Sequence, residues 1–274
     1  MIELFQITND PETARRCDAL EGLRLFVDLE RQGKAERQAG RNTFISAHQL
    51  DDVARVKAVL ARARLMVRVN PLNPDSAAEV DAVLARGADL LMLPMFTRAD
   101  ELRAFVALVA GRVPVVALLE TAGALDTLDE WIGTPGLNEV FVGLNDLHIS
   151  LGCRFMFEPL AQGVVERVAV AAKAQGLRFG FGGIARLDEG LLLGRDVLAE
   201  HVRLGSQAVI LSRTFHRSDS PVPFEDEVAA LRAAERQLAT RTPAQTECDR
   251  QRIAGVIHSI ATATAARQGA GASV

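Results

Sequence analysis

Residues 114–147 read PVVALLETAGALDTLDEWIGTPGLNEVFVGLNDL and contain the pattern on which the fold prediction rests. The apolar run 114–119 ends in Glu120, an amphipathic segment follows, and a second apolar run, 139–144, is followed closely by Asp146. Short apolar strands that alternate with amphipathic helices are typical of parallel sheets built from repeated strand–helix units. This stretch therefore predicts one such unit, with a polar side chain after each strand.

The same alternation extends over most of the chain. Strands are predicted at residues 3–7, 24–29, 64–69, 89–94, 114–119, 139–144, 178–181 and 207–211. Their starts lie roughly 30 residues apart on average, close to the spacing expected when about 250 residues are divided among eight units of a closed barrel. We predict a (β/α)8 TIM barrel of the α/β class, with additional C-terminal helices.

The predicted barrel core spans residues 1–222, and residues 223–267 form C-terminal helices. Two helical patterns, 224–240 and 243–266, exceed the single helix that closes such a barrel. We expect the surplus helix to pack on the barrel or on a neighbouring subunit, exchanged between subunits. The small residues of 268–274 predict a flexible tail.

Composition excludes several classes of protein. A chain of 274 residues with 49% hydrophobic residues can bury a full core without disulfides, and its three widely spaced cysteines fit neither a disulfide framework nor a metal clip. The net charge of −4, with both signs interleaved, lacks the basic stripe of a nucleic-acid-binding protein. No apolar run approaches the roughly 20 residues of a membrane helix, and the N-terminus does not resemble a signal peptide. We expect a cytoplasmic protein with no nucleic-acid or membrane partner.

The polar strand ends are the candidate site, because active sites of these barrels lie at the carboxyl ends of the strands. Glu120 and Asp146 follow adjacent strands and would offer hard oxygen ligands to Mg²⁺, or to Mn²⁺ or Co²⁺. Two structural alternatives remain open, in which Asp146 caps the next helix and Glu120 pairs with an arginine.

Arg68 ends the third predicted strand and is the candidate for binding a substrate carboxylate, since a guanidinium can make two parallel hydrogen bonds to it. The alternative is a structural salt bridge from Arg68 to Asp28 or Glu30. If Arg68 binds substrate instead, we expect Asp28 and Glu30 to contact Arg68 and the metal ligands and to hold them in position. Further substrate contacts are predicted at the ends of the last three strands, from Asn145, Gly183 and Ser212.

Five short stretches together resemble the HpcH/HpaI aldolase and citrate lyase beta-subunit family, in order and in position, from about residue 2 to residue 215. These stretches are FVDLE (26–30), VRVN (67–70), GAD with MLPM (87–89 and 92–95), LLET (118–121) and VGLNDL (142–147). The resemblance implies a barrel that forms a homo-oligomer, a trimer or hexamer, with exchanged C-terminal helices. It also implies a divalent ion on Glu120 and Asp146, with Arg68 on the carboxylate and oxygen of a 2-oxo acid or its enolate.

The chain departs from this family pattern at the general base. The aldolase branch has a catalytic histidine three residues after the aspartate of strand two, where this chain has Arg31. The role then passes to a metal-bound hydroxide, to Glu30 or to a histidine. We favour His48 over His148, because His48 lies on the loop that follows strand two and its ordinary pKa of about 6.5 suits proton transfer at neutral pH.

The sequence therefore predicts a divalent-metal-dependent aldolase that joins or cleaves pyruvate, or a related 2-oxo acid, and an aldehyde through a metal-stabilised enolate. A Schiff-base route is disfavoured, because Lys57 and Lys173 lie in predicted helices and Lys34 in a loop. One alternative is a lyase acting on an acyl-CoA thioester, although the chain lacks the larger C-terminal region that this branch generally has. Another is a catalytically silent barrel that serves as a binding subunit.

Overall fold

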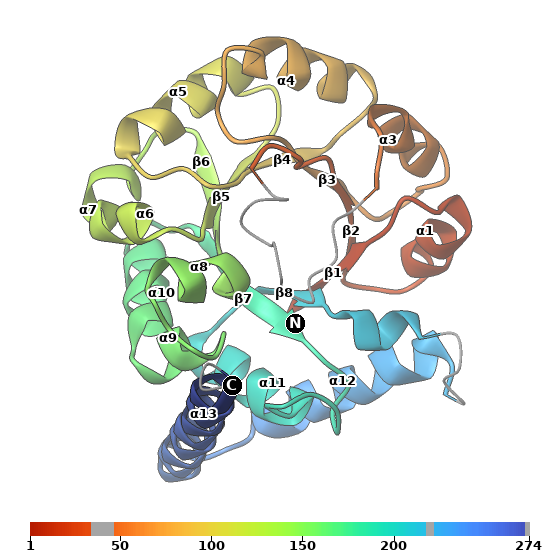
Figure 1. Ribbon diagram of the computed structural model, residues 1–274. Coiled ribbons are helices and arrows are strands. Elements are labelled where there is room, and N and C mark those ends of the chain that lie inside the picture. The colour runs from red at the N-terminus through yellow and green to blue at the C-terminus, as the bar shows by residue number, and fades with distance from the viewer. Residues whose placement is uncertain (34–46, 218–221, 272–274) are drawn as a thin grey trace.

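The structure is a computed structural model that describes residues 1–33, 47–217 and 222–271. Within these residues eight parallel strands form a closed barrel in chain order (Figure 1). The strands are β1 Glu3–Ile7, β2 Leu23–Asp28, β3 Leu65–Arg68, β4 Leu90–Leu93, β5 Val115–Leu119, β6 Leu137–Val142, β7 Arg178–Ile184 and β8 Ala208–Leu211. The prediction of a (β/α)8 barrel is confirmed.

Helices form a ring outside the strands (Figure 1). In chain order they are α1 Pro11–Asp18, α3 Leu50–Lys57, α4 Ser76–Ala85, α5 Ala99–Val109, α6 Ala122–Asp126, α7 Leu128–Trp131, α8 Leu144–Ser150, α9 Glu158–Ala161, α10 Val164–Ala174, α11 Gly194–Leu204, the 3-10 helix η1 Arg213–His216, α12 Phe224–Leu238 and α13 Pro243–Gly271. Strand β6 ends two residues earlier than predicted, because Gly143 turns the chain into α8. Asp146 therefore lies in the first turn of a helix and not directly at a strand end.

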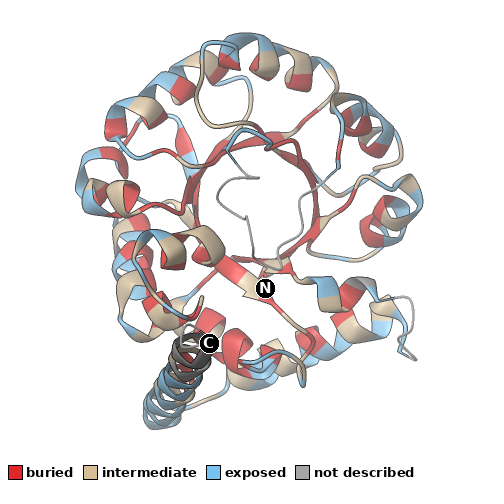
Figure 2. Cartoon of the chain, viewed as in Figure 1, coloured by how far each residue is buried: buried red, intermediate tan, exposed pale blue. Residues whose placement is uncertain are grey.

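The strands separate two apolar cores, and Figure 2 shows them buried throughout most of the barrel. In β2, Leu25 and Val27 pack in the layer between strands and helices, while Phe26 points into the barrel beside Phe5 and Met66. Successive side chains of a strand point to opposite faces. Because both faces are buried, the strands contain nearly continuous apolar runs, which is why the sequence pattern located them.

The amino end of the barrel is closed by paired charges. The fully buried Arg24 donates to both carboxylate oxygens of Glu139, at 2.7 and 2.9 Å, and to Glu3 at 2.5 Å. Arg178 donates to the same oxygen of Glu3 at 2.8 Å. The guanidinium of Arg24 also lies 4.6 Å from the centre of the Phe5 ring. These contacts pair the carboxylates of Glu139 and Glu3 with at least one guanidinium each.

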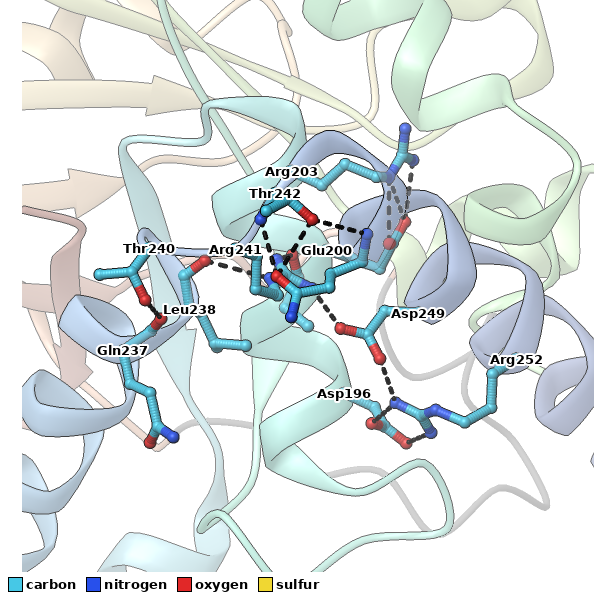
Figure 3. A network of polar contacts seen from close by, with 12 residues as sticks. Asp196, Glu200, Arg203, Gln237, Leu238, Thr240, Arg241, Thr242, Asp249 and Arg252 are labelled. Atoms are coloured by element: carbon cyan, nitrogen blue, oxygen red, sulfur yellow. Dashed lines mark hydrogen bonds and ion pairs between the residues drawn. The ribbon is translucent and has the colours of Figure 1, made fainter.

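The C-terminal helix α13 packs against α9 and α11 of its own chain, with Ile253, Ile257 and Ala261 buried. Figure 3 shows the polar contacts along this junction, in which Arg252 makes two hydrogen bonds to Asp196, at 3.0 and 2.7 Å. The exchange of helices between subunits stays a prediction.

Helix α13 continues to Gly271, beyond the predicted end at 266, so helix occupies most of the stretch predicted as a flexible tail from residue 268. Adding a residue to an existing helix costs far less free energy than starting one, which outweighs the low helix propensity of Gly269 and Gly271. Neither α13 nor any other helix within the described residues is long and apolar enough to cross a membrane.

Candidate active site

Arg68 and Asp28 form the best-defined contact at the carboxyl end of the barrel. They end the neighbouring strands β3 and β2 and are partners in the strand register. Arg68 donates from Nε and Nη2 to the two carboxylate oxygens of Asp28, at 2.9 and 2.8 Å, and its Nη1 lies 3.4 Å from Glu30 Oε2. The Phe26 ring lies beneath it, 5.7 Å from the guanidinium carbon.

This geometry leaves Arg68 a second edge for a ligand. A guanidinium has five N–H donors, and the edge formed by Nη1 and Nη2 is distinct from the edge that faces Asp28. Burial lowers the pKa of Arg68, but Asp28, Glu30 and Glu120 outweigh that effect and raise it above its usual value, so the side chain stays charged. The structural pairing and the predicted substrate contact of Arg68 are therefore compatible.

Glu120 follows β5 directly and is 2% exposed. Its Oε1 accepts the backbone N–H of Met95 at 3.1 Å. Burial raises the pKa of Glu120 to about 8; Arg68 opposes this rise, while Glu30 and Asp146 add to it. The ionised form of this carboxyl is thus costly in the absence of a further positive charge.

Asp146 lies near Glu120 and adds to the negative potential there. It is partly exposed and belongs to the first turn of α8, whose N-cap is Gly143, so Asp146 is not the cap residue of this helix. The first turn of a helix is a favourable place for a carboxylate, since unpaired backbone N–H groups point outward there.

The donor set fits a hard divalent cation. Among the described residues no group of three or more histidine, cysteine, aspartate or glutamate side chains is arranged to hold a metal ion. Mg²⁺, however, is commonly held by one or two carboxylates and keeps water or substrate oxygens as its other ligands. The buried Glu120, whose charge is disfavoured, and the neighbouring Asp146 meet this requirement.

His48 is buried beside the end of β2, and its Nδ1 accepts the backbone N–H of Asp28 at 3.1 Å. Arg31, the residue at the position of the family's histidine, donates to the His48 carbonyl at 2.8 Å. A neutral imidazole whose Nδ1 accepts carries its proton on Nε2. In this tautomer neither nitrogen is available as a base, so the predicted role of His48 requires the proton to move between the ring nitrogens. Lys34 and residues 35–46 lie outside the described residues.

The remaining predicted residues also lie toward the carboxyl end of the barrel. Asn145 belongs to α8, Gly183 to β7, and Ser212 follows β8, where its hydroxyl lies 3.0 Å from the hydroxyl of Thr214. Their substrate contacts stay predictions. His148, the second candidate base, donates from Nδ1 to the carbonyl of Leu144 one turn earlier in α8, at 3.0 Å.

Three residues near the site were missed by the sequence reasoning. Asn70 accepts the backbone N–H groups of Arg31 and Gln32 at 2.9 and 3.1 Å, and so anchors the start of the loop after β2. Its position directly after a strand was the available signal. The other two, Met95 and Gly143, act on Glu120 through a backbone N–H and through the absence of a side chain. A sequence pattern carries little signal for either effect.

A separate cavity of about 310 Å³ lies between α1 and the segments around η1 and the start of α12. Its lining combines the basic side chains of Arg16, Arg186 and Arg217 with the rings of Phe215 and Phe224. Arg16 and Arg217 also form exposed ion pairs with acidic residues, at 2.9 and 3.2 Å. Such pairs contribute little stability and can be exchanged for a bound anion.

A family model and several known proteins are similar to this chain. The family model described as HpcH/HpaI aldolase/citrate lyase matches residues 2–185. A (3S)-malyl-CoA thioesterase from a strain of Cereibacter sphaeroides is 31% identical over 238 residues, which cover 77% of this chain and 83% of that protein. For the thioesterase of a second strain, 31% identical over 182 residues, the match spans 64% of its length, less than two thirds.

Solved structures agree on the fold. The citrate lyase beta subunit from M. tuberculosis, complexed with oxaloacetate and magnesium, superimposes with a TM-score of 0.60 at 21% identity, over 86% of this chain and 97% of that one. An HpcH/HpaI aldolase from Desulfitobacterium hafniense DCB-2 gives a TM-score of 0.59 at 17% identity, over 88% and 94% of the two chains. At these identities the likeness shows the fold alone.

Proposed function

The chain belongs to the HpcH/HpaI aldolase/citrate lyase family, and we propose that it is a divalent-metal-dependent carbon–carbon lyase acting on pyruvate, or a related 2-oxo acid, and an aldehyde. The observation that carries the proposal is the buried Glu120, whose pKa is raised to about 8 although Arg68 lies near it. A carboxyl in this position is costly to the fold and suited to binding a cation.

In this proposal Glu120 and Asp146 hold Mg²⁺, Mn²⁺ or Co²⁺. The bound ion would supply positive charge opposite the substrate oxygen on which negative charge develops during cleavage of the carbon–carbon bond. Support comes from the donor set described above and from the related citrate lyase beta subunit, whose complex contains magnesium and oxaloacetate, itself a 2-oxo acid.

Arg68 binds and orients the substrate carboxylate through its Nη1 and Nη2 edge. Asp28 holds the opposite edge of the guanidinium with two hydrogen bonds, and Phe26 supports its face. A side chain held in this way loses little conformational entropy when the substrate arrives, which favours binding in one orientation. Asp28 is thus a positioning residue for Arg68.

Of the candidates for proton transfer, Glu30 and His48 have side chains beside Arg68 and Asp28, and a metal-bound hydroxide is the third. The hydrogen bond from the Asp28 N–H to His48 Nδ1 favours Glu30, since His48 would first need a different tautomer. Glu30 is buried and lies 3.4 Å from Arg68 Nη1, next to the edge assigned to the substrate. We expect Glu30→Gln to lower kcat by about 10² or more. If instead His48→Ala removes an acidic limb near pH 6–7, the original assignment to His48 is correct.

An acyl-CoA thioester is the second candidate substrate class. It is favoured by the name of the relatives that are 31% identical, (3S)-malyl-CoA thioesterase, and by the arginine-lined cavity of about 310 Å³. The mixed basic and aromatic lining suits a ligand that carries phosphates and apolar groups. The third possibility, a silent binding subunit, is the conclusion only if neither substrate class reacts.

One assay separates these functions. Purified protein is offered aldol substrates and, separately, malyl-CoA, with Mg²⁺, Mn²⁺ or Co²⁺, while release of pyruvate, of glyoxylate and of free thiol is followed. We expect the wild-type protein to release pyruvate and EDTA to abolish this release. Glu120→Gln and Asp146→Asn should release no pyruvate. Glu247→Gln, a change on the exposed face of α13, should release pyruvate as the wild type does. Release of glyoxylate from malyl-CoA by carbon–carbon cleavage, or of free thiol by thioester hydrolysis, without aldol activity supports the thioester function. A borohydride-trapped pyruvate adduct on a lysine contradicts the metal-dependent class.

A further inference from the structure

We propose that the ends of β4 and β6 form a seat that positions Glu120. The seat has two parts: the backbone N–H of Met95 binds one carboxylate oxygen, and the missing side chain at Gly143 leaves room for the other. Neither residue is a metal ligand; both act through Glu120. The consequence for metal binding rests on the proposed function.

The backbone of Met95 has an uncommon conformation. Its φ of 57° lies in the left-handed region, which residues other than glycine rarely adopt. The other described non-glycine residue with a positive φ, Ala110, ends helix α5 in the ordinary way for a helix C-terminus. Met95 follows a strand and ends no helix, and its conformation directs its N–H to Glu120 Oε1. An uncommon backbone conformation with this contact indicates a functional constraint.

Neighbouring contacts maintain the conformation of Met95. The hydroxyl of Thr121 donates to the carbonyl of Phe96 at 2.7 Å, and the N–H of Thr97 donates to Glu101 Oε2 at 2.7 Å. Two consecutive residues after β5, Glu120 and Thr121, therefore contact two consecutive residues after β4. This double contact holds the segment at the Met95 N–H and at the Phe96 carbonyl.

Gly143 is required for space and not for its backbone freedom. Its φ of −82° is accessible to other residues. A Cβ at this position would lie 2.7 Å from Glu120 Oε2, 3.0 Å from Glu120 Cβ and 3.1 Å from Leu118 Cδ1. The Gly143 N–H donates to the carbonyl of Leu119 at 2.9 Å, which hinders retreat of the backbone. A methyl group here would therefore displace the Glu120 carboxylate.

The test measures Mn²⁺ affinity by calorimetry in the full-length protein. Gly143→Ala should weaken Mn²⁺ binding about 10-fold or more, as expected when the support of a metal ligand is disturbed. The matched control is Gly255→Ala in α13, where a Cβ meets nothing within 4 Å and affinity should stay unchanged. If Gly143→Ala keeps the wild-type Mn²⁺ affinity while Glu120→Gln loses it, the seat is wrong and the metal site is retained. Unchanged affinity in Glu120→Gln overturns the metal site and the seat together.

A second measurement applies even if Gly143→Ala folds poorly. In metal-free buffer, Gly143→Ala should lower the Tm less in a Glu120→Ala background than in the wild type. The Glu120 carboxylate, the group nearest to the added methyl, is absent in that background. An equal loss of Tm in both backgrounds contradicts the seat.

The Met95 part of the seat is tested through Thr121. Thr121→Val removes the hydroxyl that holds the carbonyl of Phe96, and should weaken Mn²⁺ binding, while Thr121→Ser should restore it. Equal affinities in the two variants and the wild type overturn this part. The Thr121 hydroxyl also accepts the N–H of Ala124 as the cap of α6, so Tm alone does not decide the result.

Discussion

At the amino end of the barrel the fully buried Arg24 holds Glu139 with two hydrogen bonds and Glu3 with one, and Arg178 supplies a second guanidinium to Glu3. At the carboxyl end Arg68 is surrounded by Asp28, Glu30 and Glu120, and only Asp28 receives two hydrogen bonds from it. Both ends contain an arginine over a phenylalanine ring, but at the amino end two guanidinium groups face two acids, whereas at the carboxyl end three acids lie around Arg68.

The difference separates stability from function. Matched buried charges avoid the penalty of an unpaired ion, and they close the end of the barrel that carries no chemistry in folds of this type. A buried carboxyl whose pKa is raised, as in Glu120, costs folding free energy when it is ionised, and this cost is offset when a cation binds to the folded protein. Changes at the amino end should therefore affect folding alone, and changes at the carboxyl end should affect binding and turnover.

The largest effect is expected from Arg24→Ala. It leaves the buried Glu139 without its two strongest hydrogen bonds, and should destabilise the protein by about 3 kcal/mol or more. Denaturant unfolding measures this loss. Arg16→Ala, which breaks an exposed pair with Glu225, should cost about 1 kcal/mol or less. Equal losses in the two variants would mean that the Arg24 contacts do not stabilise the amino end.

Glu120→Gln should stabilise the metal-free protein at pH 8, in contrast to Arg24→Ala, which lowers stability. The pKa of Glu120 is about 8 in the folded protein and near 4.5 when unfolded, so the folded state binds the proton more tightly. Metal-free stability therefore falls as pH rises from about 4.5 to about 8, by an amount on the order of 3–4 kcal/mol, and Glu120→Gln removes this fall. Thermal unfolding in EDTA at pH 5 and pH 8 tests it. A Gln variant less stable than wild type at pH 8 contradicts the strained carboxyl.

Arg68→Lys should reduce turnover by more than its effect on folding stability accounts for. Lysine keeps the charge but cannot hold Asp28 along one edge and a substrate carboxylate along the other. We expect a loss of about 1–3 kcal/mol of transition-state stabilisation, measured as kcat/KM. Arg24→Lys is the matched change at the amino end and should lower stability instead. If both variants lose turnover alike, the two ends are not functionally distinct.

A further effect at the carboxyl end is a pH dependence of metal binding. Because a bound cation must displace the proton from Glu120, Mn²⁺ affinity should rise by up to about tenfold per pH unit as pH approaches 8 and then level. Arg68, Glu30 and Asp146 all act on this carboxyl and set where the rise ends. Calorimetry in two buffers with different ionisation enthalpies measures the released proton. Affinity that does not vary between pH 6 and pH 8 contradicts the raised pKa.

Much of the candidate site could be located from the sequence, because parallel strands in chain order bring all their carboxyl ends to one rim. Glu120 and Arg68 were found from their positions after apolar runs, and both lie at that rim, close to Asp28 and Glu30. The boundaries were less accurate where a glycine redirects the chain, as at Gly143 before α8.

The apolar periodicity by itself determined the barrel, since a strand buried on both faces must be apolar along its length. Only the tertiary structure decided which charges are matched. Arg24 and Glu139 lie 115 residues apart in the chain, and the distance between such side chains depends on barrel closure and not on any local pattern. The same holds for the Met95 N–H, the space at Gly143 and the tautomer of His48, because each depends on contact between atoms of different strands or loops.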